Sequence, residues 1–571
     1  MSPGITGWLQ RALVLIVVPL ILYGALLPSM PLLEPDEGRY SAIPQEMNRS
    51  GDYITPRLHG VVYLEKPPLS YWMTAIFFRL FGEGELTSRL WTGLCAWGMI
   101  LLTYAMGARF FNRRAGLFAA AVLTTSVFHF LIGRINILDM PLAFFVTLAA
   151  WAGFRFVEEE GRRKFWVYLL YLASALAFLT KGLIGVVFPF AILFFWMLAA
   201  GKWRFLPRLI SPAGIAVFLL VALPWLVLVQ WANPDFFRFF FIQEHFLRYT
   251  TTMHDRDAFF LYYLPVVLLG FIPWLPFLWR VFRESRFRGP EPANRWGLSF
   301  LLAWLAFVFV FFSISSSKLI PYAAPLFPPL AVLIGVWFGT WAEGSASRNL
   351  PPGSRRWPVV IQSAVLIAVM IVPPFLTNLE ALRELAFLFP FSWLLKVLPP
   401  VLVLAALSVL PYRMERFGRT AWFFSIYLLS ALFLGSVLFP LAGFLTPYKT
   451  ALPVALAARD IVPKGEPLYQ FQVTFYGIDF YDGVRTPIVD DFGELEYGMN
   501  RLPPEEKARF FLTTQEFFEL LREKKELYAV TQYARRVAVL KRFSPRLEEL
   551  WTNGAFSIFR VSCGTPPGTK P

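Results

Sequence analysis

Residues 210–230 read ISPAGIAVFLLVALPWLVLVQ, a run without a single charged side chain. A helix needs about 20 consecutive apolar residues to cross a hydrocarbon core of about 30 Å, so this run predicts a membrane-spanning helix. Similar runs recur between residues 10 and 445, and we expect about 13 crossings in all. Their approximate bounds are 10–29, 88–107, 115–133, 140–157, 165–180, 182–200, 210–230, 259–280, 296–313, 321–342, 357–377, 391–411 and 421–445.

The composition agrees with a membrane protein and excludes a purely soluble or disordered chain. Hydrophobic residues make up 57% of the 571 residues and charged residues only 16%, whereas a soluble domain usually carries about 25% charged residues. Lysine and arginine number 53 against 38 aspartate and glutamate, which gives a net charge of +15. In a membrane protein such an excess lies mainly on cytoplasmic loops, so we expect no nucleic-acid partner.

The loop charges predict the orientation of the chain. Basic residues gather on every second loop, for example Arg109, Arg113 and Arg114 on one and Arg162 and Arg163 on another. The positive-inside rule then puts the N-terminus in the cytoplasm, and an odd number of spans puts the C-terminus on the far side. We therefore expect a multi-pass membrane protein without a cleaved signal peptide.

Residues 446–571 differ from the rest because their apolar runs are short and charges of both signs return. We expect two domains: a transmembrane domain over 1–445, with a long outer loop at 30–87, and a small extracytoplasmic α/β domain over 446–571. Thr514 is predicted to cap a helix that runs to Lys525. Predicted strands cover Leu468–Val473, Thr486–Val489, Arg509–Leu512, Leu527–Val530 and Ala555–Val561.

The outer loop carries the strongest chemical signal. It contains EPDEGRY at 34–40, GDY at 51–53 and YLEKPPLSYW at 63–72. Apolar residues at helical spacing over 39–49 and 69–81 predict two amphipathic helices lying in the membrane interface. A solvated loop is the alternative. Asp36, however, closely follows the first span. A carboxylate near the membrane costs free energy, so it is usually paired or has a functional role.

These motifs resemble the first outer loop of the integral-membrane C-type glycosyltransferases (GT-C architecture), within the protein O-mannosyltransferase superfamily. The most similar branch is the bacterial one that transfers 4-amino-4-deoxy-L-arabinose from undecaprenyl phosphate to lipid A. The resemblance covers roughly residues 10–330 and extends through RINILDMP at 134–141, LTKG at 179–182, QEHF at 243–246 and SKLIPY at 317–322. Later spans and residues 446–571 match only in layout.

The resemblance implies an inverting glycosyltransferase of the bacterial inner membrane that uses a polyprenyl-phosphate sugar donor. The acceptor would be a glycolipid such as lipid A, or a protein hydroxyl as in O-mannosylation. Membrane lipids surround the enzyme, and we expect a monomer. A transporter is the alternative from another class. It is disfavoured because the charges lie in the first outer loop and at span ends rather than in paired, broken helices.

Transfer needs a base for the acceptor proton and positive charge for the departing phosphate. By the resemblance Asp36 is the general base or orients the acceptor, and the structural alternative is an ion pair with Arg39. Glu37 orients Asp36 or binds substrate. Arg39 and Lys66 fit the phosphate role, and the alternative for Lys66 is snorkelling toward headgroups. Tyr63 and Tyr71 are candidates to donate to sugar or phosphate, with interfacial anchoring as the alternative. Glu65 is a further substrate-binding candidate that could pair with Lys66 or help bind an ion.

Beyond the loop, Asp139 matches a functional position, with a helix N-cap as its alternative. Lys181 is a second cationic contact or a partner of a headgroup, and Arg134 is a candidate partner of Asp139. Lys318 and Tyr322 belong to a stretch that approaches the lipid phosphate in the family. His245 completes the substrate-binding candidates. The four histidines show no dense ligand spacing, so we expect no metal and no certain cofactor, although a divalent ion that bridges the phosphate remains an alternative.

Overall fold

The chain forms two compact units in the structure, which is a computed structural model. It describes residues 3–25, 27–247, 259–272, 274–275, 277–278, 281, 292–342, 398–399, 402, 419–532, 534–543 and 546–562. Met1–Leu27 and Arg89–Leu441 make up one unit, here called the helical unit. Pro28–Ser88 and Ala442–Pro571 make up the other, here called the mixed unit. By contacts, the outer loop therefore groups with the last part of the chain, whereas the division predicted at 445/446 stays a prediction.

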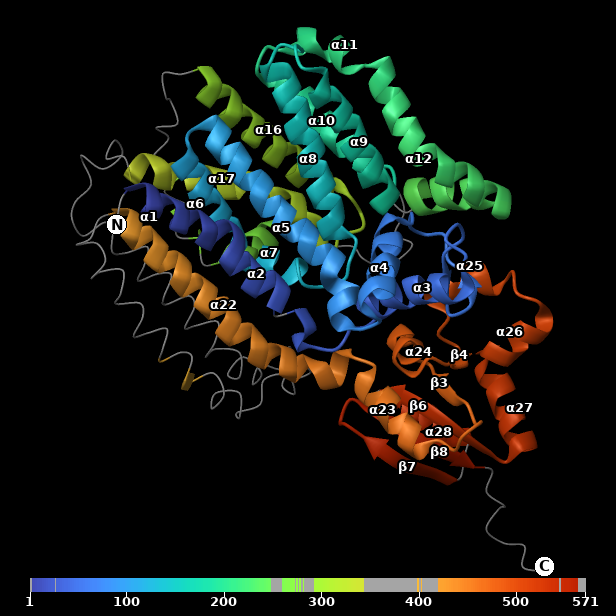
Figure 1. Cartoon of the computed structure of the whole chain (residues 1–571). Coiled ribbons are helices and arrows are strands. Elements are labelled where there is room, and N and C mark those ends of the chain that lie inside the picture. Colours follow the sequence, from blue (N-terminus) through green and yellow to red (C-terminus); the bar gives the residue numbers. More distant parts are fainter. Residues whose placement is uncertain are drawn as a thin grey trace, which may run out of the picture. The chain divides into compact units, whose positions relative to one another are not determined.

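The helical unit contains long helices (Figure 1), several of which are apolar. In the described part of the chain, 6 helices are long and apolar enough to cross a membrane. The prediction of a polytopic helical membrane protein is therefore confirmed. The spans expected at 357–377 and 391–411 lie outside the described residues, apart from 398–399 and 402. The candidate spans are Gly7–Ala25, Glu85–Phe110 (α5), Asp139–Glu158 (α8), Pro212–Ala232 (α12), Arg295–Ile314 within α16 and Ile320–Thr340 across η6 and α17.

The remaining helices of this unit are shorter or extend the spans. The first span is built from α1 (Pro3–Ala12), η1 (Leu13–Val17), α2 (Val18–Leu20) and η2 (Ile21–Ala25). The others are α6 (Arg113–Thr124), α7 (Val127–Ile132), α9 (Lys164–Lys181), α10 (Ile184–Ala199), α11 (Leu206–Leu209), η5 (Arg238–Leu247), α14 (Tyr263–Gly270), α16 (Pro292–Ile314), η6 (Ile320–Leu326), α17 (Phe327–Ala342) and α22 (Arg419–Lys449), of which the last continues into the mixed unit.

The run at 115–133, expected as one span, is broken in the structure. Helix α6 ends at Thr124 and α7 begins at Val127. The hydroxyls of Thr124 and Thr125 donate to the carbonyls of Ala120 and Ala121 at 2.7 and 2.8 Å. Such back-bonding supplies an alternative to the helical ladder and often accompanies a bend or an end. The polar run Thr124–Ser126 therefore divides this apolar segment.

Small residues let helices of this unit approach closely. Helix α17 packs on α6, and a Cβ added at Gly335 of α17 would lie 2.4 Å from the Ala119 nitrogen of α6. Membrane helices use small residues at such crossings because lipid supplies no hydrophobic drive for association. The same principle applies where α10 packs on α9: a Cβ at Gly185 would meet the Ala177 carbonyl carbon at 2.4 Å.

The mixed unit begins with the two helices predicted in the outer loop. They are α3 (Asp36–Ser50) and α4 (Leu69–Phe81), and they pack on each other. The short antiparallel strands β1 (Arg57–Leu58) and β2 (Val61–Val62) connect them. The helical prediction for 39–49 and 69–81 is confirmed, whereas their place in a membrane interface stays a prediction.

The rest of the mixed unit is a 6-stranded sheet in the order β5-β4-β3-β6-β8-β7. Strands β5, β4, β3 and β6 run parallel, and β8 and β7 complete the sheet as an antiparallel pair. The strands are β3 (Leu468–Phe471), β4 (Ile488–Val489), β5 (Phe511–Leu512), β6 (Glu526–Gln532), β7 (Arg546–Thr552) and β8 (Phe556–Ser562). All five predicted strands are present, and β7 is an additional one.

Helices cover both faces of this sheet (Figure 1). Successive strand residues point to opposite sides, so apolar side chains on each face pack against a different set of helices. Tyr469 and Phe471 pack with Phe517 of α27 and Leu540 of α28, whereas Leu468 packs in a separate core. That second core contains residues of α23 and α24. The helices are α23 (Leu452–Ile461), α24 (Tyr476–Asp482), α25 (Glu496–Met499), α26 (Pro504–Phe510), α27 (Thr514–Lys524) and α28 (Ala534–Phe543).

The predicted cap of α27 is wrong by one residue. Thr513, not Thr514, precedes the helix, and its hydroxyl accepts from the Glu516 N–H. The Glu516 carboxylate in turn accepts from the Thr513 N–H at 2.7 Å, which completes a reciprocal capping box. Either of the two adjacent threonines could cap the helix. Only Thr513 has a glutamate three residues later, and this spacing is the sequence signal that separates them.

Candidate functional site

A chain of charged and phenolic groups surrounds Arg39 in the mixed unit. Asp36 is the first residue of α3, and one turn later Arg39 lies on the same side of the helix. The Arg39 guanidinium pairs with the carboxylates of Asp36 and Glu494. The Arg39 side chain is 8% exposed, whereas that of Asp36 is 52% exposed. The ion pair weighed as the bland alternative for Asp36 therefore exists, and it leaves the carboxylate accessible from outside.

The YLEKPP motif continues the same chain of contacts. The Tyr63 hydroxyl donates to Glu494 at 2.9 Å and lies 3.4 Å from Glu65. The Lys66 ammonium lies 3.5 Å from the Glu65 carboxylate and donates to the Glu65 carbonyl at 3.1 Å. The Lys66 side chain is 13% exposed. The structure thus brings the predicted residues Asp36, Arg39, Tyr63, Glu65 and Lys66 into one cluster, here called the Arg39 cluster.

Two buried donors of the Arg39 cluster have no protein partner. Among the described residues, neither the Nε of Arg39 nor the hydroxyl of Tyr71 has a hydrogen-bond partner. Tyr71 is 1% exposed and its ring lies 6.0 Å from that of Tyr40. Burial raises the pKa of Tyr71 well above its usual value, so the hydroxyl keeps its proton. A buried donor without a partner costs about 1–3 kcal/mol, which favours a ligand that accepts from it.

The charge of Arg39 is stable at any physiological pH. Burial alone would lower its pKa, but nearby Tyr40, Tyr63, Asp36 and Glu65 more than offset that effect, and the pKa is raised. The guanidinium carbon lies 4.8 Å from the Tyr40 ring centroid, a cation–π distance. The cluster therefore holds one permanent positive charge between two carboxylates.

Two acidic residues beside Asp36 have structural contacts. Glu37 is fully buried, and its carboxylate accepts from the Leu33 N–H at 2.9 Å. The Glu34 carboxylate accepts from the N–H groups of Gly477 and Tyr476 at 2.6 and 3.2 Å. Burial raises the pKa of Glu34 from 4.5 to about 8, although both N–H groups act in the opposite direction. These contacts fix the backbone that leads into α3 and hence the position of Asp36.

A second cluster of predicted residues lies in the helical unit. Asp139 begins α8, Lys181 ends α9, and the Lys181 ammonium lies 2.7 Å from the Asp139 carboxylate. The same ammonium lies 4.8 Å from the ring centroid of Tyr322 in η6. Asp139 is not an N-cap, because Leu138 holds that position. The N-cap alternative is therefore wrong, and the Asp139 carboxylate instead pairs with Lys181. We call these three residues the Lys181 cluster.

The other predicted residues of the helical unit have separate surroundings. Lys318 is 8% exposed and donates to the Ser315 carbonyl at 2.7 Å. Arg134 lies between α7 and α8, with its guanidinium carbon 4.8 Å from the Phe130 ring centroid. The side chain of His245 lies outside the described part of the chain.

Glu494 and Glu34 are the residues that sequence reasoning missed. Glu494 lies in a short helix of residues 493–495, more than 400 positions from Arg39, and no local pattern marks it. Glu34 opens the EPDEGRY motif, but its partners Tyr476 and Gly477 lie equally far along the chain. Within the described residues, no three His, Cys, Asp or Glu side chains gather as a metal site would require.

Comparison with known proteins relates this chain to one group of membrane enzymes. Residues 65–228 match the family described as dolichyl-phosphate-mannose-protein mannosyltransferase. An undecaprenyl phosphate-alpha-4-amino-4-deoxy-L-arabinose arabinosyl transferase of Edwardsiella ictaluri is 32% identical over 334 residues, or 58% of this chain and 59% of that protein. A second transferase of this name, from Pseudomonas fluorescens, is 34% identical over 56% of this chain and 58% of its own length. The aligned part thus spans less than two thirds of these relatives.

A solved structure is similar over nearly the full length. The crystal structure of ArnT from Cupriavidus metallidurans bound to undecaprenyl phosphate matches 97% of this chain and 98% of that chain, with a TM-score of 0.81 and 25% identity. The apo state of the same protein gives a TM-score of 0.80. The resemblance inferred from the sequence, to the aminoarabinose branch of the C-type glycosyltransferases, is therefore confirmed.

Proposed function

We propose that this chain is an inverting glycosyltransferase that moves a sugar from undecaprenyl phosphate to an acceptor on the outer face of the membrane. The sugar is aminoarabinose or a related one, and the acceptor is lipid A. The observation that carries the proposal is the Arg39 cluster, with a permanent cation and an accessible carboxylate. The buried Arg39 Nε and the nearby Tyr71 hydroxyl have no hydrogen-bond partner among the described residues. The similarity to proteins that bear this activity in their names supports it.

The reaction is a single displacement at the anomeric carbon. Asp36 accepts the proton of the acceptor hydroxyl, and the freed oxygen pair forms a bond to that carbon. The bond from the carbon to the phosphate oxygen breaks, and its electron pair stays on the phosphate. Base catalysis of this kind contributes about 10²–10⁴-fold in rate. The half-exposed position of Asp36 at the start of α3 supports this role because an acceptor can reach it.

Fixed cations stabilise the departing phosphate. Arg39 and Lys66 of the outer loop supply this positive charge. The Arg39 Nε and the Tyr71 hydroxyl donate hydrogen bonds to phosphate or sugar oxygens. Glu37 acts as a positioning residue through the backbone before α3. Lys181 and Lys318 supply further positive charge toward the donor lipid, and Asp139 orients Lys181.

The wider organisation belongs to the same proposal. We infer about 13 membrane crossings, an N-terminus in the cytoplasm and residues 446–571 as a periplasmic domain of an inner-membrane protein. The transmembrane domain covers 1–445 and includes the catalytic outer loop 30–87. The protein acts as a monomer. Arginine-rich loops such as the one with Arg109, Arg113 and Arg114 support this orientation.

A protein hydroxyl is the second candidate acceptor because residues 65–228 match a family named for protein mannosylation. The deciding experiment incubates purified protein with undecaprenyl-phosphate sugars and with lipid A or peptide acceptors, and weighs the products by mass spectrometry. Mass added to lipid A supports the proposal. Mass added only to the peptide would replace the acceptor, and no transfer from any lipid-linked sugar would reject the enzyme.

Two variants test the residue roles in that assay. Asp36→Asn should lower transfer about 100-fold or more with normal protein level, whereas the matched Asp460→Asn, at an exposed position of α23, should not. Lys66→Ala should weaken binding of the donor lipid. Wild-type rates in Asp36→Asn would remove Asp36 from the mechanism, and unchanged donor affinity in Lys66→Ala would remove Lys66 from the phosphate site.

A further inference from the structure

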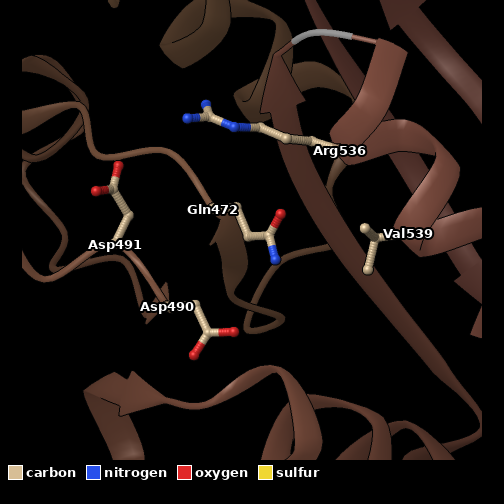
Figure 2. Close-up of a pocket in the computed structure, with 5 residues that line it drawn as sticks. All are labelled: Gln472, Asp490, Asp491, Arg536 and Val539. Carbon is tan, nitrogen blue, oxygen red and sulfur yellow. The ribbon is translucent and has the colours of Figure 1, made fainter.

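The mixed unit contains a pocket outside the Arg39 cluster. Its volume is about 370 Å³, within the range of about 300–1,000 Å³ that holds small ligands. Figure 2 shows its lining: Gln472 lies between Arg536 and Asp490, with Asp491 and Val539 on either side. None of these residues belongs to the proposed transfer site, so the pocket requires a separate explanation.

The pocket lies at the carboxyl ends of three adjacent parallel strands. Gln472 directly follows β3, and Asp490 and Asp491 directly follow β4. Arg536 and Val539 lie on α28, the helix after β6. Strand β3 pairs in parallel with both β4 and β6. The lining therefore comes from one edge of the sheet, although the residues span 68 positions of sequence between 472 and 539.

This edge is also a point where the winding of the sheet reverses. The helix after β3 is α24, whose Ile478 packs in the core on one face. The helix after β6 is α28, whose Leu540 packs in the core on the opposite face. When neighbouring parallel strands lead to helices on opposite faces, a crevice opens between their carboxyl ends, and open α/β sheets bind ligands there.

The backbone holds two of the lining residues in an uncommon conformation. Gln472 and Asp490 each come first after their strand and have φ values of 52° and 58°. Their N–H groups donate to the carbonyls of Val489 and Leu512 at 2.9 and 3.0 Å, which extends the sheet by one bond. The Asp490 carboxylate also accepts from the Thr514 N–H at 3.0 Å. Gln472 and Asp490 are thus held side by side at the carboxyl ends of β3 and β4.

The lining chemistry fits a sugar ring better than an anion. Carboxylate, guanidinium and amide groups are planar and present paired acceptors or donors, which match neighbouring hydroxyls. Val539 adds an apolar contact for the C–H face of a ring. The lining contains two carboxylates and one guanidinium, so its formal charge is negative. This charge favours an ammonium group over a phosphate.

We propose that this pocket binds a single sugar ring that carries hydroxyl and ammonium groups. The site is independent of the transfer reaction, because its residues contribute nothing to the proposed displacement. Asp490 and Asp491 accept from the ammonium and hydroxyl groups, Arg536 and Gln472 donate to or accept from hydroxyls, and Val539 contacts the ring. The ligand is either a free amino sugar or the sugar headgroup of a glycolipid.

The test measures binding of free glucosamine to the full-length protein in detergent by calorimetric titration at pH 7. Asp491→Asn and Arg536→Gln should each weaken binding about tenfold, as expected for loss of one charge-assisted hydrogen bond. The matched control Glu523→Gln, on the exposed side of α27, should bind as the wild type does. Asp36→Asn should also bind normally, which separates this pocket from the transfer site.

Several outcomes would overturn the proposal. They are absence of glucosamine binding, equal weakening in Glu523→Gln, or loss of binding in Asp36→Asn. Inorganic phosphate is the second probe. Phosphate binding that disappears in Arg536→Gln, without glucosamine binding, would identify an anion site instead. A glycolipid with the same amino sugar, in nanodiscs, tells the two sources apart: tighter binding than that of free glucosamine indicates a lipid-anchored headgroup.

Discussion

The ion pair between Asp139 and Lys181 should stabilise the helical unit measurably. It joins the start of α8 to the end of α9, with 2.7 Å between the ammonium and the carboxylate. The side chains are 11% and 16% exposed, so water screens the pair only weakly. Lys181 also lies over the Tyr322 ring. Replacing either charge by an uncharged residue of similar size leaves the other one enclosed.

The expected magnitude follows from this enclosure. A charge-assisted hydrogen bond contributes about 1.5–3 kcal/mol, and an enclosed charge without its partner costs about 3–5 kcal/mol. Because both side chains keep some exposure, we expect Asp139→Asn and Lys181→Met each to lower the free energy of unfolding by about 2–4 kcal/mol. The double variant should lose little more than either single one. The coupling energy should therefore be about 2–4 kcal/mol.

The assay is a double-mutant cycle in mixed micelles, with unfolding driven by SDS and followed by circular dichroism. The pair Arg162 and Glu160 is the matched control, since its charges are 3.1 Å apart but 80% and 63% exposed. Its coupling should be below about 1 kcal/mol. A coupling for Asp139 and Lys181 no larger than that of the control would refute the reasoning. It would mean that the helix ends are held by packing alone.

Three further predictions concern the mixed unit. Burial raises the pKa of Glu34 to about 8, so the folded state holds more protons than the unfolded one and stability should fall from about pH 5 to 8, by at most about 1.4 kcal/mol per pH unit. Glu34→Gln should flatten that slope in unfolding measured across pH, and equal slopes would contradict it. Gly38→Ala puts a Cβ 2.5 Å from the Glu34 carboxylate and should cost about 1–3 kcal/mol in chemical unfolding, whereas Gly84→Ala, with nothing within 4 Å, should not. Thr513→Ala should lower the free energy of unfolding, measured by chemical unfolding, by about 1 kcal/mol. A larger loss in Thr514→Ala would contradict the observed cap.

Local patterns predicted the elements of this chain better than its contacts. The helical spacing of apolar residues over 39–49 and 69–81 predicted α3 and α4, and β-branched and aromatic runs predicted five strands. Strand β7 was missed because its sequence, RLEELWT, is rich in charge and largely exposed. The break between α6 and α7 was missed because apolar length outweighed Thr124, Thr125 and Ser126, whose hydroxyls bond to the backbone.

The candidate site was predictable only in part, for a physical reason. Motif resemblance identified Asp36, Arg39 and Lys66, since they lie within one short stretch. Glu494, the partner of Arg39 and Tyr63, could not be found, because pairs separated by hundreds of residues form through the tertiary fold and leave no periodic trace. Asp139 and Lys181 were also expected separately and form one ion pair, although they are only 42 positions apart, because the packing of α8 on α9 brings them together.

The discontinuity of the mixed unit affects how the protein is made. Residues 28–88 leave the ribosome early, yet Arg39 and Tyr63 contact Glu494, and Glu34 contacts Gly477, which are translated several hundred codons later. Throughout elongation, the early loop lacks these late-arriving neighbours. A nascent or prematurely terminated chain should therefore lack the proposed transfer activity, which should appear only once translation has passed the codon for Glu494.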